Sequence, residues 1–269
     1  SMNVKRSEPS RPLSTKDWVP DQPGAWALAL LPALAGMVIG GFDVGRLWLT
    51  GAWLLCYCVQ FTAARWLRSR FQRRYLPPVL TYAALLAVAG VPLLAMHPLI
   101  LVWAPLYVVC AGVSFLCAWL RRERSLWANA AAVIATSMMA YVVYAFDAPD
   151  LLERTGMGLA LAGIFMLTQF GSVLYVKTMI RERRNNRYLA ASWIWHAALL
   201  ALACAVPGRT VPMMIIAAIL LLRAVVMPLL GRRIRIKPIA VGMLEMVLSV
   251  AVCAYAPFCA PWISMALTF

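Results

Sequence analysis

The sequence is poor in charged residues, and poorest in acidic ones. Only 13% of its 269 residues are charged, with 10 Asp+Glu against 25 Lys+Arg, whereas 63% are apolar. A soluble domain usually carries about 25% charged and about 45–50% apolar residues. So few polar side chains cannot cover a water-exposed globule, which excludes a soluble protein. The net charge of +15 leaves a nucleic-acid binder as a class to be tested.

Histidine and paired cysteines are also lacking. The chain has 2 His and 7 Cys, and no two cysteines have the C-x-x-C spacing of metal and redox sites. Cysteine in an apolar helix is most often a small packing residue. His97 and His196 lie far apart in the sequence. We therefore expect no metal site and no cofactor.

What the sequence has instead is a series of apolar runs of membrane-spanning length, roughly 20 residues each. Only short polar segments separate them. We expect nine spans, at residues 24–42, 47–66, 77–95, 98–119, 125–146, 157–178, 188–207, 211–230 and 238–258. This predicts an all-α, polytopic transmembrane bundle. Residues 22–269 would form its single domain, after a mobile cytoplasmic tail of residues 1–21.

The basic residues predict which side of the membrane each loop occupies. With the N-terminus inside, 21 of the 25 Lys and Arg lie in the tail or in the loops after spans 2, 4, 6 and 8. Arg46, Arg154 and Arg209 lie outside, and Arg223 lies within a span. We therefore expect a multi-pass protein with its C-terminus outside. Such loops suit anionic headgroups, so we expect membrane lipids as partners and no nucleic acid.

Two of the basic loops resemble each other. Gln60-Phe61 precedes the loop after span 2, and Gln169-Phe170 precedes the loop after span 6. Aligned on the tyrosines that follow them, three arginines of one loop match three of the other: Arg68, Arg70 and Arg74 match Arg181, Arg183 and Arg187. Internal duplication is common in membrane folds with a site between two halves. We expect halves at about 22–119 and 125–269, the alternative being that basic loops are alike by composition.

This arrangement carries two resemblances. Nine spans with distinctive loops after spans 2 and 6 resemble the UbiA superfamily of intramembrane prenyltransferases. The segments 20–27 (PDQPGAWA), 176–183 (VKTMIRER) and 242–245 (GMLE) resemble the YwiC-like family of bacterial integral membrane proteins. That resemblance covers residues 20–255 and implies the bacterial cytoplasmic (inner) membrane. It departs at Gln22-Pro23, where the family usually has Glu-His before Gly-Ala-Trp.

The likeness to UbiA enzymes does not extend to their chemistry. Those enzymes hold Mg²⁺ on Asp-rich motifs in the same two loops, because Mg²⁺ needs carboxylate oxygens. This chain has no carboxylate between Gln60 and Tyr75, and only Glu182 between Gln169 and Tyr188. These absences argue against a Mg²⁺-dependent prenyltransferase, and leave open whether any reaction is catalysed.

The arginines offer another chemistry. A guanidinium presents a planar fork that pairs with phosphate or carboxylate. If the two arginine clusters faced each other across a cytoplasmic cavity, they would bind an amphipathic anion without metal. A prenyl or lipid phosphate and a quinone precursor have this character. The alternative is that the arginines only set topology and lie among headgroups.

Ionisable residues within spans are costly and therefore informative. Arg223 and Glu245 are each 11 residues from residue 234, the centre of the turn between spans 8 and 9. At about 1.5 Å per residue they lie at equal depth, which predicts an ion pair. Its role is left open between fixing helix register and taking part in function.

Further polar residues fall at similar depths in other spans. We predict that one pocket, open to the cytoplasm, collects Gln60, Asn129, Gln169 and His196, with Tyr57, Ser172, Tyr175 and Trp195. The alternative for His196 is a hydrogen-bonded packing role. Three function classes remain: a UbiA-like protein that binds an anionic amphiphile and is a candidate metal-independent transferase, a secondary transporter with a central Arg–Glu pair, and a non-catalytic membrane scaffold.

Overall fold

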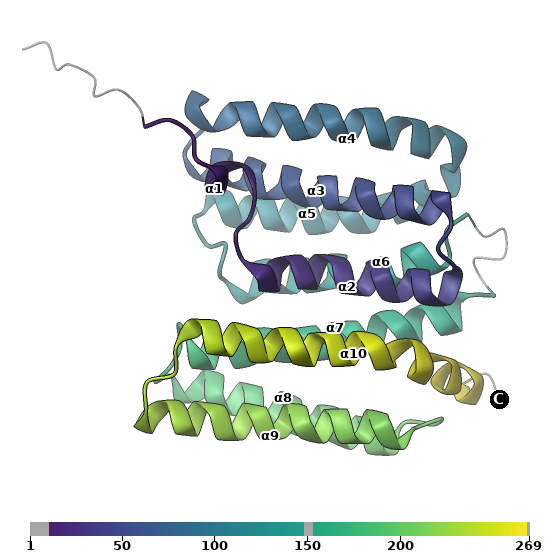
Figure 1. Cartoon of the computed structure of the whole chain (residues 1–269), viewed down its shortest axis with the longest axis vertical. Helices are drawn as coiled ribbons and strands as arrows, with labels where there is room; N and C mark the ends of the chain where they lie inside the picture. The colour runs from purple at the N-terminus through teal and green to yellow at the C-terminus, as the bar shows by residue number, and fades with distance from the viewer. Residues whose placement is uncertain (1–10, 148–152, 268–269) are drawn as a thin grey trace, which may run out of the picture.

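The computed structural model describes residues 11–147 and 153–267, and within them it contains helices and no strand. Nine helical segments in these ranges are long and apolar enough to cross a membrane, which confirms the predicted all-α class and nine spans. They are built on α2 (Pro23–Gly40), α3 (Val44–Arg68), α4 (Leu76–Met96), α5 (Ala104–Trp119), α6 (Leu126–Tyr144), α7 (Thr155–Met179), α8 (Asn186–Ala205), α9 (Val211–Arg233) and α10 (Pro238–Leu267). Figure 1 shows them running side by side.

Local sequence explains several helix ends. Pro23 and Pro238 begin α2 and α10, where a missing backbone N–H leaves no helical hydrogen bond unmade. Gly41 ends α2 with a φ of 116°, which favours glycine. The 3-10 turns η1 (Arg73–Tyr75) and η2 (Pro98–Trp103) lead into α4 and α5.

α3 and α7, which carry the two Gln-Phe pairs, both have 25 residues. The internal duplication itself stays a prediction.

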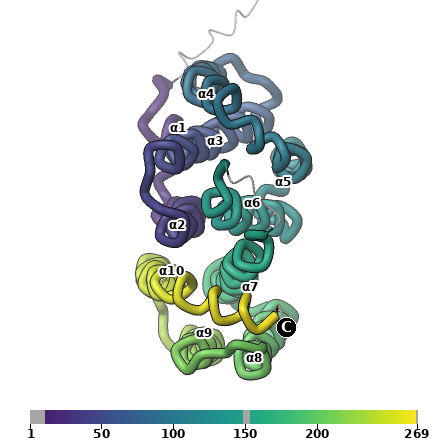
Figure 2. The backbone as a smooth tube through the Cα atoms, turned by 90° about the vertical axis from the view of Figure 1, so that its right-hand side faces the viewer, coloured from purple at the N-terminus to yellow at the C-terminus, as the bar shows by residue number. Residues whose placement is uncertain are grey.

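The centre of the bundle is built from small side chains. Ala35 of α2, Ala140 of α6, and Ala256 and Ala260 of α10 pack in one buried cluster with Phe165 of α7. Small residues let helices approach closely in a membrane. Figure 2 shows α2–α6 and α7–α10 as two groups, one above the other, with α2, α6, α7 and α10 between the outer helices. This central layer joins the two groups.

Gly36 illustrates how close the approach is. A Cβ at Gly36 would lie 2.6 Å from the carbonyl oxygen of Ala140 and 3.0 Å from Cβ of Val143. We expect Gly36→Ala to push α2 from α6 and lower the free energy of unfolding by about 1–3 kcal/mol. Thermal unfolding in detergent measures this. The control is Gly51→Ala on α3, where a Cβ meets nothing within 4 Å. Equal losses in both variants would contradict a specific α2–α6 contact.

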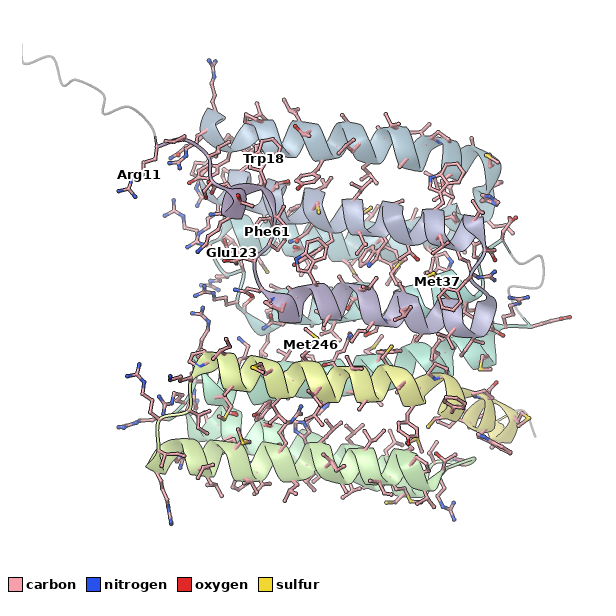
Figure 3. All side chains as sticks on the ribbon, viewed as in Figure 1. Arg11, Trp18, Met37, Phe61, Glu123 and Met246 are labelled. Atoms are coloured by element: carbon pink, nitrogen blue, oxygen red, sulfur yellow. The ribbon has the colours of Figure 1, made fainter. Side chains whose placement is uncertain are left out.

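The two ends of the bundle differ in charge. We call the basic end the one formed by the loops after α3, α5, α7 and α9, where basic side chains gather (Figure 3). At the opposite end Asp43 caps α3, and its Oδ1 accepts from the Arg46 N–H at 2.8 Å. That hydrogen bond, together with the Arg46 guanidinium, holds the pKa of the Asp43 carboxyl below its usual value. Arg46 also donates to the carbonyl oxygens of Val143 and Tyr144, which ties α3 to the end of α6.

Part of the predicted tail contacts the bundle. Residues 1–10 lie outside the described residues, whereas α1 (Thr15–Trp18) lies against the basic end of α3. Asp17 Oδ1 is 3.3 Å from Arg65 Nη2, and Arg65 Nη1 donates to the Lys16 carbonyl at 2.7 Å. The segment just before α2 is therefore held by Arg65 in the last turn of α3.

Candidate functional site

Arg223 and Glu245 form a buried ion pair, as the sequence predicts. Nη1 of Arg223 on α9 donates to Oε1 of Glu245 on α10. The two residues are 5% and 9% exposed. The helices are joined by a short turn, so equal distances from that turn place both side chains at one level. The hydroxyl of Ser172 on α7 lies near the Glu245 carboxylate.

His196 of α8 joins the same pair. Its Nε2 lies 3.0 Å from Nη2 of Arg223, and its Nδ1 lies 2.7 Å from the carbonyl oxygen of Ser192. A guanidinium only donates and a carbonyl only accepts. The network therefore assigns the proton to Nδ1, with Nε2 as acceptor and the imidazole neutral. A fully buried histidine is thereby used to orient Arg223.

Tyr175 of α7 covers the face of the guanidinium. The Arg223 Cζ lies 4.3 Å from the ring centroid, a cation–π contact in a site shielded from water. Tyr175 is 0% exposed. Its Oη and the Arg223 Nε are both buried, and neither has a hydrogen-bond partner among the described residues. We call Tyr175, His196, Arg223 and Glu245 the charge cluster. It draws one side chain from each of α7, α8, α9 and α10.

A cavity of about 330 Å³ opens at the basic end. Its lining comes from the ends of α7, α8 and α9 and the segments beside them: Thr178, Met179, Arg183, Arg184, Asn186, Pro228, Gly231, Arg232 and Ile236. Arg183 Nη2 donates to the Gly231 carbonyl at 2.7 Å, and Arg232 Nη2 donates to Asn186 Oδ1 at 2.7 Å. Arginines thus stand beside an apolar surface. We call this the basic-end cavity.

A second, much smaller cavity lies near the centre of the bundle. It holds about 20 Å³ and is lined by Leu31, Phe165, Thr168, Gln169, Ser172, Leu220, Leu248, Ser249 and Val252. Such a space accommodates about one water molecule, which needs about 10–15 Å³. Side-chain oxygens of Thr168, Ser172 and Ser249 and the amide of Gln169 lie around it. We call this the central cavity.

The structure does not collect the remaining polar candidates in one pocket. Gln60 donates to the Ser114 hydroxyl at 2.8 Å, between α3 and α5. Gln169 accepts from Ser137 at 2.9 Å, between α7 and α6. The Asn129 amide lies 3.5 Å from the carbonyl oxygen of Arg124 at the start of α6. Of the eight residues predicted to share a pocket, His196 and Tyr175 belong to the charge cluster, and Gln169 and Ser172 line the central cavity.

The arginines of the first loop contact residues of the α2–α6 group. Arg68 Nε lies 3.5 Å from Glu123 Oε1. Arg70 donates to the Trp119 carbonyl, and its Cζ lies 4.1 Å from the indole centroid. Arg74 lies over the ring of Tyr75. None of the three lines the basic-end cavity, so the two matching clusters do not face each other across it.

The second loop supplies one of the predicted cavity residues. Arg183 lines the basic-end cavity, whereas Arg181 and Arg187 are exposed and do not. Arg184 and Arg232, which complete the cavity with Asn186, were not among the predicted site residues. Two features of the sequence could have indicated them as cavity residues: their charge, and their position at the ends of spans 6 and 8. Within residues 11–147 and 153–267, no group of three or more His, Cys, Asp or Glu side chains is placed to hold a metal ion.

Comparison with known proteins finds similarity to one protein family. Residues 19–144 match the YwiC-like protein family. The chain is similar to this family over the helices α2 to α6. Its relatives include an uncharacterized protein of Haemophilus influenzae, 25% identical over 183 residues, which cover 66% of this chain and 74% of the relative. The uncharacterized protein YwiC of Bacillus subtilis is 27% identical over 192 residues, 68% of this chain and 76% of its own length.

The YwiC-like match confirms the resemblance seen in the sequence. The matched residues span α2 to α6, whereas the charge cluster and the basic-end cavity are built from α7–α10 and the loops between these helices. No solved structure matches the chain. The UbiA-like topology therefore stays a prediction.

Proposed function

We propose that this YwiC-like protein binds the anionic head of an amphiphile in the basic-end cavity. The observation that carries the proposal is that three arginines, Arg183, Arg184 and Arg232, line one cavity of about 330 Å³. Ligand sites commonly measure about 300–1,000 Å³. The positive side chains around it favour phosphate or carboxylate over an uncharged head.

Two of the three arginines are held in place before any ligand arrives. Arg183 uses one N–H on Gly231 and Arg232 uses one on Asn186. A guanidinium has five N–H donors, so most remain free for an oxyanion. Preorganised donors lose little side-chain entropy when they bind, which favours affinity.

The other surfaces of the cavity suit an apolar tail. Met179, Pro228 and Ile236 contribute carbon surface to the lining. Leu230 and Ile234 near the same end of α9 are 40% and 55% exposed. A chain that leaves the cavity would meet these side chains and then the lipid-facing side of the bundle. Prenyl phosphates, lipid phosphates and acidic quinone precursors all combine such a head and tail.

The lining residues contain no Asp or Glu, so this binding relies on arginine and not on a bridging Mg²⁺. The basic residues gathered at this end support placing it in the cytoplasm of a bacterial cell, with the protein in the inner membrane. Anionic headgroups are abundant at that surface.

The test is binding of dodecyl phosphate to the purified protein in an uncharged detergent, measured by calorimetry. Arg184→Gln removes one charged donor and is expected to weaken binding roughly 10-fold or more, since such bonds contribute about 1.5–3 kcal/mol. The matched control is Arg181→Gln in the same loop, which lies outside the cavity. Inorganic phosphate as competitor separates a free anion from an amphiphile. Equal affinities for the wild type and Arg184→Gln would contradict the proposal.

A secondary transporter is the second candidate. The observation in its favour is that the Arg223–Glu245 pair lies between two cavities, one open at the basic end and one in the centre. Transporters commonly bind substrate near the membrane midplane. Uptake of labelled dodecyl phosphate into sealed vesicles would favour transport, whereas binding without uptake would favour a receptor-like protein. A scaffold role has no comparable observation behind it.

A further inference from the structure

Three helical segments meet the basic-end cavity, the charge cluster and the central cavity in the same order. From the basic end inward, the positions on α7 are Met179, Tyr175 and Ser172, and those on α9 are Pro228, Arg223 and Leu220. The third series begins at Ile236, just before α10, and continues with Glu245 and Ser249 on α10. On α7 and α9, steps of four or five residues place the cluster about 6–8 Å inward from the cavity. The charge cluster therefore separates two polar spaces.

Two donors of the charge cluster are unsatisfied. Tyr175 Oη and Arg223 Nε are buried without a partner among the described residues. Tyr175 packs against Met179 and Ile236, which line that cavity. Buried donors are nearly always satisfied, by protein or by ordered water. An acceptor oxygen, most simply that of water, therefore belongs between the cavity and the cluster.

On the other side the path continues through Glu245. Its carboxylate lies near Ser172, and Ser172 lines the central cavity with Ser249 and Gln169. Space for one water with several polar partners is the setting in which buried water is found. Beyond this point the path closes, because Leu161, Phe165, Val252 and Ala256 pack in the apolar core.

We propose that Glu245 is a proton-binding site on a water path that enters from the basic end and stops at the centre. A hydronium ion in the path transfers its proton to the carboxylate and leaves as water. The carboxylate becomes a neutral carboxyl group, and the cluster gains one positive charge. Arg223 then loses its counter-ion and keeps only His196 and the face of Tyr175. The inference concerns protons and stands whether or not the basic-end cavity binds an amphiphile.

The groups facing Glu245 leave it as the proton acceptor. They are Tyr175 on α7, His196 on α8 and Arg223 on α9, and α2, which packs on α10, has no ionisable residue between Pro23 and Gly40. The ring of His196 is occupied on both nitrogens, by Ser192 and by Arg223. A proton on its Nε2 would point at the guanidinium. Tyr175 and Arg223 are already protonated.

Infrared difference spectroscopy of the whole protein in lipid discs tests the proposal. On lowering the pH from neutral, the wild type should gain the carbonyl band of a buried protonated carboxyl group. Glu245→Gln should lose that band, while Glu123→Gln, which changes the half-buried partner of Arg68, should keep it. If Glu245→Gln fails to fold, Arg223→Gln/Glu245→Gln takes its place, since it removes both charges together. Absence of the band in the wild type, or its survival in the Glu245 variant, would overturn the assignment.

Entry from the basic end has its own readout. Ile236→Trp places a bulky ring at the cavity lining and is expected to slow the rise of the band after a pH jump, without removing it. Arg181→Gln, which lies outside the cavity lining, should leave both the band and its rate unchanged. An unchanged rate in Ile236→Trp would exclude entry through the basic-end cavity. Failure of the wild type to bind dodecyl phosphate would contradict the ligand proposal and leave the proton site intact.

Discussion

Arg223→Met is expected to lower the free energy of unfolding by about 3–5 kcal/mol, because it leaves a charged partner alone in a buried site. Glu245 is 9% exposed and takes its counter-charge from Arg223. The substitution also removes the donor to His196 and the cation over Tyr175. Methionine keeps a long apolar side chain on the ring, so the loss reports charge more than volume. Unfolding by a denaturing detergent, followed by tryptophan fluorescence, measures the change.

The double variant Arg223→Met/Glu245→Met is the control for that experiment. Replacing both members of a buried pair by apolar residues is often neutral or stabilising, so we expect it to recover most of the loss. Arg223→Lys keeps the charge but lacks the fork that bonds Glu245 and His196 together, and should fall between the two. If the double variant is as unstable as the single one, the uncompensated charge is not the cause.

Gly208→Ala is expected to be the next most damaging change, with a loss of about 2–4 kcal/mol. Gly208 lies in the loop between α8 and α9 with a φ of 76°, where an L side chain is strained. A Cβ there would overlap the carbonyl oxygen of Trp262 and lie 2.6 Å from its carbonyl carbon. Backbone atoms of α10 cannot move aside as a flexible side chain would. Thermal unfolding in detergent again measures the loss.

Gly242→Ala provides the comparison for Gly208. It lies within α10, and a Cβ there meets nothing within 4 Å. Alanine is the better helix former by about 1 kcal/mol, so this variant should be neutral or more stable. A similar loss in both variants would mean that the contact between the loop and α10 has no special role.

The spans and the ion pair were predictable because they depend on position along the chain. A run of about 20 apolar residues is sufficient to identify a span. Two helices joined by a short turn are neighbours, so the levels of Arg223 and Glu245 were enough to pair them. Gln60 shows the limit of this reasoning. Depth sets the level of a side chain, but not the direction in which it points or the helix it faces, and Gln60 faces Ser114 instead.

The basic-end cavity was only partly predictable for a similar reason. The repeat between the two loops favoured a site shared by both. In the structure, Arg68 and Arg70 contact Glu123 and Trp119, so the first loop makes its contacts within the first half of the chain. Arg232 comes to Arg183 through the packing of α8 on α9 and the bond to Asn186. Which arginines come together in one cavity depends on which helices are neighbours in the fold, and the similarity of the two loops does not reveal this.

The position of the ion pair also bears on how the chain is inserted during synthesis. Arg223 alone adds roughly 2.5–3.5 kcal/mol to the cost of transferring α9 from the translocon to lipid. Glu245 follows on the next helix at the same level, so the charges meet once the α9–α10 hairpin has formed. We therefore expect the two helices to leave the translocon together as one hairpin. α9 would then complete its integration only when synthesis of α10 is nearly finished.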